Sequence, residues 1–414
     1  MRQTDVRLTR RAMAAAIAVP LALTTPAGAQ VFSPTGPDAA AYGAEAGYLP
    51  GTRGARPAQS TLVGYHSRID SLYPHNTARA GPAASVLHRA AMPLELRYTF
   101  QGQTRTIADY LERHPTTGLL IARGDTILLE HYRYARTDRD RLLSQSMAKT
   151  VTGMLVGIAL RDGAIRSIDD QAAAYVPGLA GSAYGQSTIR DLLHMASGVR
   201  YVETYDGTDD HARLGIGLFG PNSPGAARVL SQFNTREAEP GTRFHYASAE
   251  SEVLGLVVMG ATGMTLSAYL ETRLWQPMGA EADATWITDT RGQEVGYCCF
   301  SAVLRDWARF GLMLAHDGAW NGRQIVPSEW MQDATTVAAP FLGTVRPGTG
   351  YGYQTWLIPG PRRQFVLLGI HGQALYVDPT ARLVMVHTAV RARPTGNPEG
   401  LELGALWRAV VAAQ

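Results

Sequence analysis

Short apolar runs near both ends of the chain predict β-strands. Gly118–Ala122 and Thr126–Tyr132 are rich in aliphatic and β-branched residues, and Arg123-Gly124-Asp125 between them is a hairpin signal. Four more β-prone runs come late in the chain, at Tyr353–Ile358, Gln364–Ile370, Gln373–Val377 and Leu383–Thr388. Strands at both ends predict one antiparallel sheet assembled from both parts of the chain.

Between these runs, apolar positions recur with the spacing of helices. The longest such stretch, Ser146–Arg161, is amphipathic and is followed by Asp162-Gly163, which is typical of a helix end. Shorter helices are expected at Ile107–Arg113, Ile168–Tyr175, Thr188–Met195, Ala249–Met259, Leu266–Leu274 and Leu401–Ala413. The polar, acidic stretch Tyr201–Arg213 is expected to be a loop that helps to shape a cleft through Tyr201 and Tyr205.

The order of elements predicts an α/β fold in which helices flank the sheet and a helical lobe is inserted. Residues 96–160 and 290–414 are expected to form the α/β lobe, and residues 161–289 the mainly helical lobe. Residues 30–95 begin with many Gly, Pro and Ala residues and are expected to form an extended or wrapping arm. A cleft is expected at the seam between the lobes.

Residues 1–29 have the layout of an export signal. Arg7, Arg10 and Arg11 precede a short apolar run, and Ala27-Gly28-Ala29 gives a small-x-small cleavage pattern. The segment around Arg10-Arg11 also resembles a twin-arginine signal. The apolar run is too short to span a bilayer and no later apolar run reaches that length, so we expect an exported, periplasmic protein without a membrane span.

Composition narrows the possible partners. Hydrophobic residues make up 45% and charged residues 18% of the chain, which favours a folded body and excludes general disorder. Four arginines against Asp5 give residues 1–29 a net charge of +3, which equals the +3 of the whole chain. The remaining chain is therefore formally neutral, and no nucleic-acid partner is expected.

The chain holds a single lysine among its 38 Lys and Arg residues, and it lies three positions after a serine. Arginine stays protonated at usable pH, whereas a desolvated lysine can become a neutral amine. Side chains three residues apart lie on one face of a helix, so Lys149 can reach the hydroxyl of Ser146. This spacing predicts a serine nucleophile with a lysine base, although a surface lysine after a serine is the simpler alternative.

Two later segments supply the other parts that acyl transfer needs. Tyr246-Ala247-Ser248 follows a Pro-Gly turn ahead of a helix, and Tyr246 can relay a proton if cationic neighbours lower its pKa from about 10. Gly372, between His371 and Gln373, lies where two strand signals meet and lets backbone approach a substrate. Packing alone is the alternative for Tyr246, a carbonyl-bonded histidine for His371, and a bulge for Gly372.

These three segments, in this order, resemble the motifs of the serine β-lactamase and D,D-peptidase superfamily. Within it, SQSMAKTVTGMLVGIALRDGAI, FHYASAES and LGIHGQALYVDP look most like the hydrolases that include 6-aminohexanoate-dimer hydrolases and esterases. The likeness extends from about Ser60 to the C-terminus. It implies a β-lactamase/transpeptidase-like fold.

The resemblance also implies roles for individual residues. Ser146 would be the acylated nucleophile, Lys149 its base and Tyr246 the proton relay. Gly372 and Gln373 would line the oxyanion hole on the sheet's edge strand. The implied activity is that of a serine hydrolase that cleaves a small ester or amide without a metal or other cofactor.

The chain also departs from that pattern. Ile370-His371-Gly372 replaces the Lys-Thr-Gly of β-lactamases and penicillin-binding proteins, so the lysine that helps to hold a β-lactam carboxylate is missing. Ser248 stands where many relatives have asparagine. Three arginines are candidates for a substitute cation: Arg200, Arg213 and Arg243. An esterase or amidase is favoured, while a β-lactamase, a D,D-carboxypeptidase and a non-turnover penicillin-binding sensor remain alternatives.

The cysteines and histidines suggest no further chemistry. Cys298 and Cys299 are adjacent and cannot join distant segments, so we expect two buried free thiols rather than a bond between neighbours. The eleven histidines form no metal-ligand motif, so no metal site is predicted. A Ser-His-Asp hydrolase of another fold is disfavoured because no G-x-S-x-G segment surrounds Ser146.

Overall fold

The computed structural model describes residues 30–414, and its main element is a nine-stranded sheet. Its central strands are antiparallel neighbours in the order β7 (Thr126–Tyr132), β6 (Thr116–Arg123), β17 (Leu383–Ala389), β16 (Gln373–Asp378) and β15 (Gln364–Gly369). Beyond β15 lie β14 (Trp356–Ile358) and β13 (Gly350–Tyr351). The predicted sheet from both parts of the chain is therefore present.

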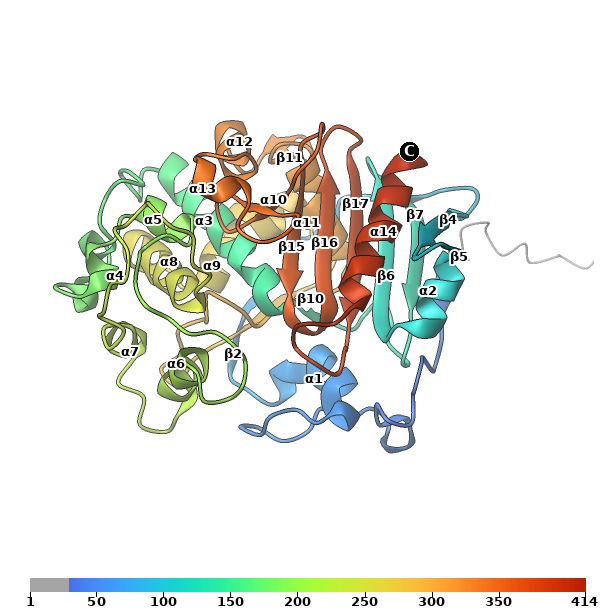
Figure 1. Cartoon of the computed structure of the whole chain (residues 1–414), viewed down its shortest axis with the longest axis horizontal. Helices are drawn as coiled ribbons and strands as arrows, with labels where there is room; N and C mark the ends of the chain where they lie inside the picture. The colour runs from blue at the N-terminus through green and yellow to red at the C-terminus, as the bar shows by residue number, and fades with distance from the viewer. Residues whose placement is uncertain (1–29) are drawn as a thin grey trace, which may run out of the picture.

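Both faces of this sheet are covered, as the continuous apolar strands require. Leu119 and Ile121 point to one face, where they join the cluster of Leu406 and Trp407 from helix α14 (Glu399–Ala412). Leu120 points to the other face and joins the cluster that includes helix α11 (Leu304–Ala315). In Figure 1, α14 crosses in front of the sheet and α11 lies behind it.

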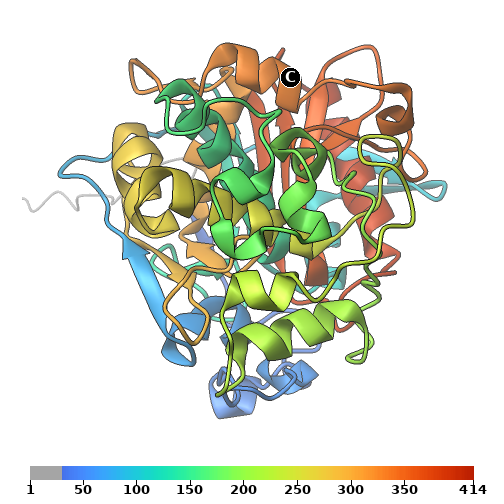
Figure 2. The same cartoon turned by 90° about the vertical axis from the view of Figure 1, so that its left-hand side faces the viewer.

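The helical part lies on the β15 side of the sheet. Helix α3 (Ala148–Arg161) packs against α8 (Ser248–Thr262), and both are almost wholly buried. Around them lie α4 (Ala183–Gln186), α5 (Ile189–Leu193), α6 (Asp210–Phe219), α7 (Ala226–Leu230), α9 (Leu266–Leu270), a π-helical turn (Glu271–Trp275) and α10 (Gln276–Met278). Figure 2 shows this helical part from its outer side.

Smaller elements complete the chain. A four-stranded sheet has the order β2 (His75–Ala78), β9 (Ala284–Ile287), β10 (Phe300–Ala302) and β8 (Leu142–Leu143). The remaining helices are α1 (Leu62–Arg68), α2 (Ile107–Arg113), α12 (Ser328–Ala334) and α13 (Pro340–Gly343). Two hairpins pair β4 (Arg97–Phe100) with β5 (Gln103–Thr106) and β11 (Ala319–Trp320) with β12 (Arg323–Gln324).

The N-terminal arm joins both sheets instead of only wrapping them. Strands β1 (Val31–Phe32) and β3 (His88–Arg89) pair in parallel with β7, while β2 extends the smaller sheet. The arm's Tyr42, Tyr48 and Val63 pack on Tyr134 of the body. The predicted export signal, residues 1–29, lies outside the described residues.

Two local predictions were wrong. Ile168–Tyr175 is not a helix: only a 3₁₀ turn forms at Ala172–Ala174, because Gln171 makes a β-bridge to Thr188. The 201–213 loop ends early, since Asp209 caps α6 by accepting a hydrogen bond from the backbone N–H of Ala212.

No single helix within residues 30–414 is long and apolar enough to cross a membrane. The bent pair of α8 and Leu266–Met278 passes by length and composition only when the two are counted together.

Candidate active site

The nucleophile candidate lies at the junction of the sheet and the helical part. Ser146 is in a 3₁₀ turn, Gln145–Met147, that continues directly into α3. Gln145 has a φ of 47°, a conformation that is uncommon for a non-glycine residue and recurs at active sites. Gly369, the last residue of β15, packs on this turn, and a Cβ there would lie 2.5 Å from the carbonyl oxygen of Ser144. Glycine therefore lets the end of β15 approach the nucleophile.

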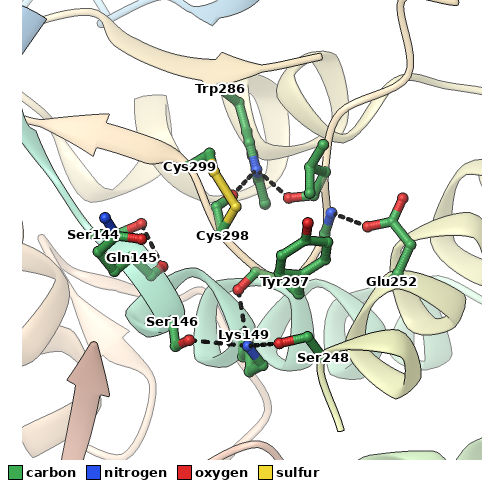
Figure 3. The surroundings of a disulfide bond; sticks show 12 residues. Ser144, Gln145, Ser146, Lys149, Ser248, Glu252, Trp286, Tyr297, Cys298 and Cys299 are labelled. Atoms are coloured by element: carbon green, nitrogen blue, oxygen red, sulfur yellow. Dashed lines mark hydrogen bonds between the residues drawn. A yellow bond between two sulfur atoms is a disulfide. The ribbon is translucent and has the colours of Figure 1, made fainter. Parts of the chain in front are cut away.

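Lys149 lies one helical turn after Ser146 and is 2% exposed. Its Nζ is 3.0 Å from Ser146 Oγ, 3.0 Å from Ser248 Oγ and 3.1 Å from the carbonyl oxygen of Tyr297, as Figure 3 shows. Burial lowers the pKa of Lys149 from 10.5 to about 8, although Glu203 and Glu252 oppose the shift. The only lysine of the chain thus has the position and the lowered pKa that suit a base.

Tyr246 lies on the other side of this pair. Its ring centroid is 5.1 Å from Lys149 Nζ, and the ring stacks on Trp356 at 5.5 Å. Burial and Glu203 raise the pKa of Tyr246 above its ordinary value, whereas a hydrogen bond with Ser146 and the charge of Arg346 only partly offset them. The condition set for a proton relay, a pKa lowered by cationic neighbours, is therefore not met. Tyr246 keeps its proton at neutral pH and suits the role of a proton donor.

Ser248 connects Lys149 to a buried carboxylate that the sequence reasoning did not single out. Its backbone N–H donates to Glu203 Oε2 at 2.7 Å, and its hydroxyl donates to Glu203 Oε1 at 2.7 Å. Glu203 also accepts a hydrogen bond from the Tyr205 hydroxyl at 2.6 Å. The acidic loop before α6 was recognised as a cleft candidate, but no motif separates Glu203 from its acidic neighbours.

The structure corrects one part of the predicted oxyanion segment, its place on an edge strand of the sheet. Gln373 is on β16, which is an interior strand between β15 and β17, and its side-chain amide donates to Ala389 O at 2.7 Å. His371 is held by its own Nδ1 contact with Arg391 O at 2.6 Å. Both β15, through Gly369, and β16 pack on the nucleophile turn.

The prediction of two free thiols was also wrong, because Cys298 and Cys299 are joined by a disulfide. The bonded pair directly follows Tyr297, whose carbonyl oxygen accepts the hydrogen bond from Lys149. The same loop is held at two other points: Trp286 Nε1 donates to Cys298 O at 3.0 Å, and the Gly296 N–H donates to Glu252 at 2.7 Å. Figure 3 shows the disulfide above the Ser146–Lys149–Ser248 row.

The three arginines that were candidates for a substitute cation pair with acidic residues elsewhere. Arg213 pairs with Asp210 at 2.6 Å, and Arg200 and Arg243 lie 3.5 and 3.7 Å from Glu237. The cation next to the site is instead Arg346, whose guanidinium stacks 3.8 Å from the ring centroid of Trp356. Within residues 30–414, no group of three or more His, Cys, Asp or Glu side chains is arranged to hold a metal ion.

Known proteins resemble this chain in sequence and fold. Residues 104–405 match the family model Beta-lactamase. The chain is 30% identical over 355 residues to the 6-aminohexanoate-dimer hydrolase of Paenarthrobacter ureafaciens, an alignment that covers 80% of this chain and 90% of that protein.

Solved structures share the fold at lower identity. A Bacillus anthracis protein with the provisional name 6-aminohexanoate-dimer hydrolase has a TM-score of 0.77 at 24% identity, covering 85% of this chain and 94% of its own. A family VIII carboxylesterase has a TM-score of 0.55 at 18% identity, covering 72% and 93%.

The fold and the comparisons together define a hydrolase of the serine type. The chain belongs to the beta-lactamase family, within a superfamily of serine hydrolases that includes esterases, amidases and β-lactamases.

Proposed function

We propose that this protein hydrolyses an ester or amide bond through an acyl-enzyme on Ser146. The observation that carries the proposal is the buried Lys149 amine, 3.0 Å from Ser146 Oγ, with its pKa lowered to about 8. The 6-aminohexanoate-dimer hydrolase of Paenarthrobacter ureafaciens supports an amide substrate, and the similarity to a carboxylesterase supports an ester.

In this mechanism, neutral Lys149 takes the hydroxyl proton of Ser146 as Oγ attacks the substrate carbonyl. The oxyanion is held by the Ser146 N–H at the start of the helix and by a backbone N–H from the end of β15. As the tetrahedral intermediate collapses, Tyr246 donates its proton to the leaving alcohol or amine and regains one from Lys149. Water then attacks the acyl-enzyme, and Ser146 leaves with a proton from the same pair.

Two alternatives of the same fold are weaker. A β-lactamase or D,D-carboxypeptidase needs a cation that holds the substrate carboxylate. The candidate next to the site is Arg346, and its guanidinium is stacked on Trp356. A penicillin-binding sensor that acylates without turnover would use the same Ser146 and Lys149, and no contact of the described residues favours it over an enzyme. We also propose export, on the basis of residues 1–29; a disulfide in the fold suits an oxidising compartment.

The test is steady-state hydrolysis of p-nitrophenyl acetate and butyrate, nitrocefin and the linear aminohexanoate dimer. Loss of the nucleophile or its base typically costs about 10⁴-fold or more, so Ser146→Ala and Lys149→Arg are expected to lose turnover of every accepted substrate. The preferred substrate then separates esterase, amidase and β-lactamase. Full turnover in Ser146→Ala would sink the proposal, and labelling without product would favour the sensor.

A further inference from the structure

Glu203 has a buried carboxylate that is connected to Lys149 by hydrogen bonds through Ser248. Its side chain is 3% exposed, and it accepts two hydrogen bonds from Ser248, one from the backbone and one from the hydroxyl. Ser248 Oγ in turn lies 3.0 Å from Lys149 Nζ. The chain of contacts therefore runs from Glu203 through Ser248 to Lys149 and on to Ser146.

Counting protons along this chain sets the direction of every hydrogen bond. An ionised carboxylate only accepts, so the single hydroxyl proton of Ser248 is directed to Glu203. Ser248 Oγ can then only accept from Lys149. The carbonyl oxygen of Tyr297, 3.1 Å from Nζ, also only accepts.

A neutral lysine amine has two N–H bonds and one lone pair. Both N–H bonds are used by Ser248 and Tyr297, so the lone pair is left for the third neighbour, Ser146 Oγ at 3.0 Å. This is the arrangement in which the amine can accept the nucleophile's proton.

We propose that Glu203 is a positioning residue that aims the lone pair of neutral Lys149 at Ser146 by fixing the hydroxyl of Ser248. The inference rests on the proposed acyl-enzyme function and deepens it. Without the carboxylate, the Ser248 hydroxyl is free to turn and donate to Lys149. Ser248 then competes with Ser146 for the only lone pair of the base.

Glu203 also acts on the charge of the site. The groups that face Lys149 are Ser146 of its own turn, Ser248 and Glu252 of α8, Tyr246 before α8, Tyr297, Glu203 and His211 of α6. Glu203 favours the protonated lysine and so raises its pKa, in opposition to burial. Glu203 has a larger influence on Lys149 than Glu252, whose own pKa burial raises to about 8.

The decisive variant is Glu203→Gln, which keeps the size of the side chain but adds an amide donor. The Gln amide can donate to Ser248 Oγ and turn its proton toward Lys149. We expect kcat/KM on a p-nitrophenyl ester to fall about 100-fold at its plateau. The acid limb of the pH profile should move to lower pH, because a raising influence on the lysine is lost. Glu203→Asp keeps the charge and should restore part of the rate with the limb near its wild-type position.

Asp209→Asn is the matched structural control. Asp209 is buried in the same loop and accepts from the backbone N–H groups of Thr204, Tyr205 and Ala212, but has no contact with Ser248. It should reduce thermal stability and leave the acid limb in place. If Glu203→Gln likewise reduces thermal stability and leaves the acid limb in place, Glu203 is only structural and the inference is overturned.

A double-mutant cycle keeps the test sharp if Glu203→Gln is poorly folded. In a Ser248→Ala background no hydroxyl remains to compete for the lone pair, so adding Glu203→Gln should cost less than about threefold. An undiminished 100-fold cost in that background overturns the role of Ser248 as the connection. Ser146→Ala tests the acyl-enzyme separately: if it retains turnover, the proposed function fails whatever Glu203 does.

Discussion

The molecule contains two buried ionic clusters that are built in opposite ways. The first surrounds Lys149, whose Nζ meets two hydroxyl groups and a carbonyl but no carboxylate directly. The second surrounds Glu402 of α14, whose carboxylate accepts from Tyr98 at 2.6 Å, Arg105 at 2.8 Å, His114 at 2.8 Å and also Arg113. Lys149 therefore has no direct partner of opposite charge, whereas Glu402 has several cationic partners.

The difference appears in the two pKa values. Burial opposes the charged form in both clusters. For Glu402, the hydrogen bonds from Tyr98, Arg113, Arg105 and His114 overcome burial and hold the pKa at about 2. For Lys149, the attraction of Glu203 and Glu252 does not overcome burial, and the pKa falls to about 8. Full neutralisation fastens α14 to the β4–β5 hairpin and to the end of α2, whereas incomplete neutralisation leaves a base that can release its proton.

The largest expected effect on stability comes from breaking the Glu402 cluster. Glu402→Gln leaves Arg105 and Arg113 without their shared carboxylate, and removing one partner of a buried ion pair costs about 3–5 kcal/mol. Urea unfolding should show this loss, while turnover per folded molecule stays near that of wild type. A loss below 1 kcal/mol would contradict the structural role assigned to this cluster.

Lys149→Met is the matched variant of the other cluster. It removes a desolvated ammonium together with hydrogen bonds that contribute about 0.5–1.5 kcal/mol each, so the two effects largely cancel. We expect unfolding free energy within about 1 kcal/mol of wild type and no turnover. A destabilisation as large as that of Glu402→Gln would erase the contrast.

The two clusters should also differ in their pH dependence, because Lys149 controls activity and Glu402 controls stability in different pH ranges. Lys149 must be neutral to act, so kcat/KM should rise about tenfold per pH unit until it levels off near pH 8. Glu402 has its pKa lowered from 4.5 to about 2, so its stabilising effect is complete above pH 4.5 and is lost as pH falls toward 2. At pH 5 to 6 the protein should be folded but slow. Flat activity from pH 5 to 8, with the fold monitored by circular dichroism, would refute the neutral-lysine step.

The sequence allowed prediction of those features that depend on local spacing. Three residues of helix bring Lys149 to Ser146, and the alternation of Leu119, Leu120 and Ile121 fits a strand that is buried on both faces. Tyr246 was identified because it precedes a helix in a recognisable segment, although its pKa shift depends on burial that spacing does not reveal.

Features that depend on how distant segments meet could not be predicted. Gly372 and Gln373 were placed on an edge strand, but β15 and β17 enclose β16, and sheet order is a property of the whole chain. Glu203 reaches Ser248 only because its loop folds back over the start of α8. The disulfide between Cys298 and Cys299 could not be predicted either, because the spacing of adjacent cysteines does not show whether they are bonded.

The smallest expected effect concerns this disulfide. Reducing it tests whether a covalent bond also helps to hold the Lys149 cluster in place. A bond between adjacent residues closes a very small ring and constrains the unfolded chain little, so a dithiol reductant should change stability by less than about 1 kcal/mol. Because Tyr297 precedes the pair and accepts from Lys149, turnover should fall about two- to threefold on reduction. Cys298→Ser with Cys299→Ser should reproduce that loss and remove the response to reductant.

A thiol titration run beside the activity assay confirms that the bond is open when turnover is measured. If reduction lowers turnover tenfold or more at unchanged stability, the Tyr297 carbonyl depends on the bond. The aim of Lys149 would then be set from two sides, by Glu203 through Ser248 and by the disulfide through Tyr297. If turnover does not change at all, the hydrogen bonds from Trp286 and to Glu252 hold the loop without help. In that case non-covalent contacts alone hold both clusters, and they differ only in how completely the buried charge is neutralised.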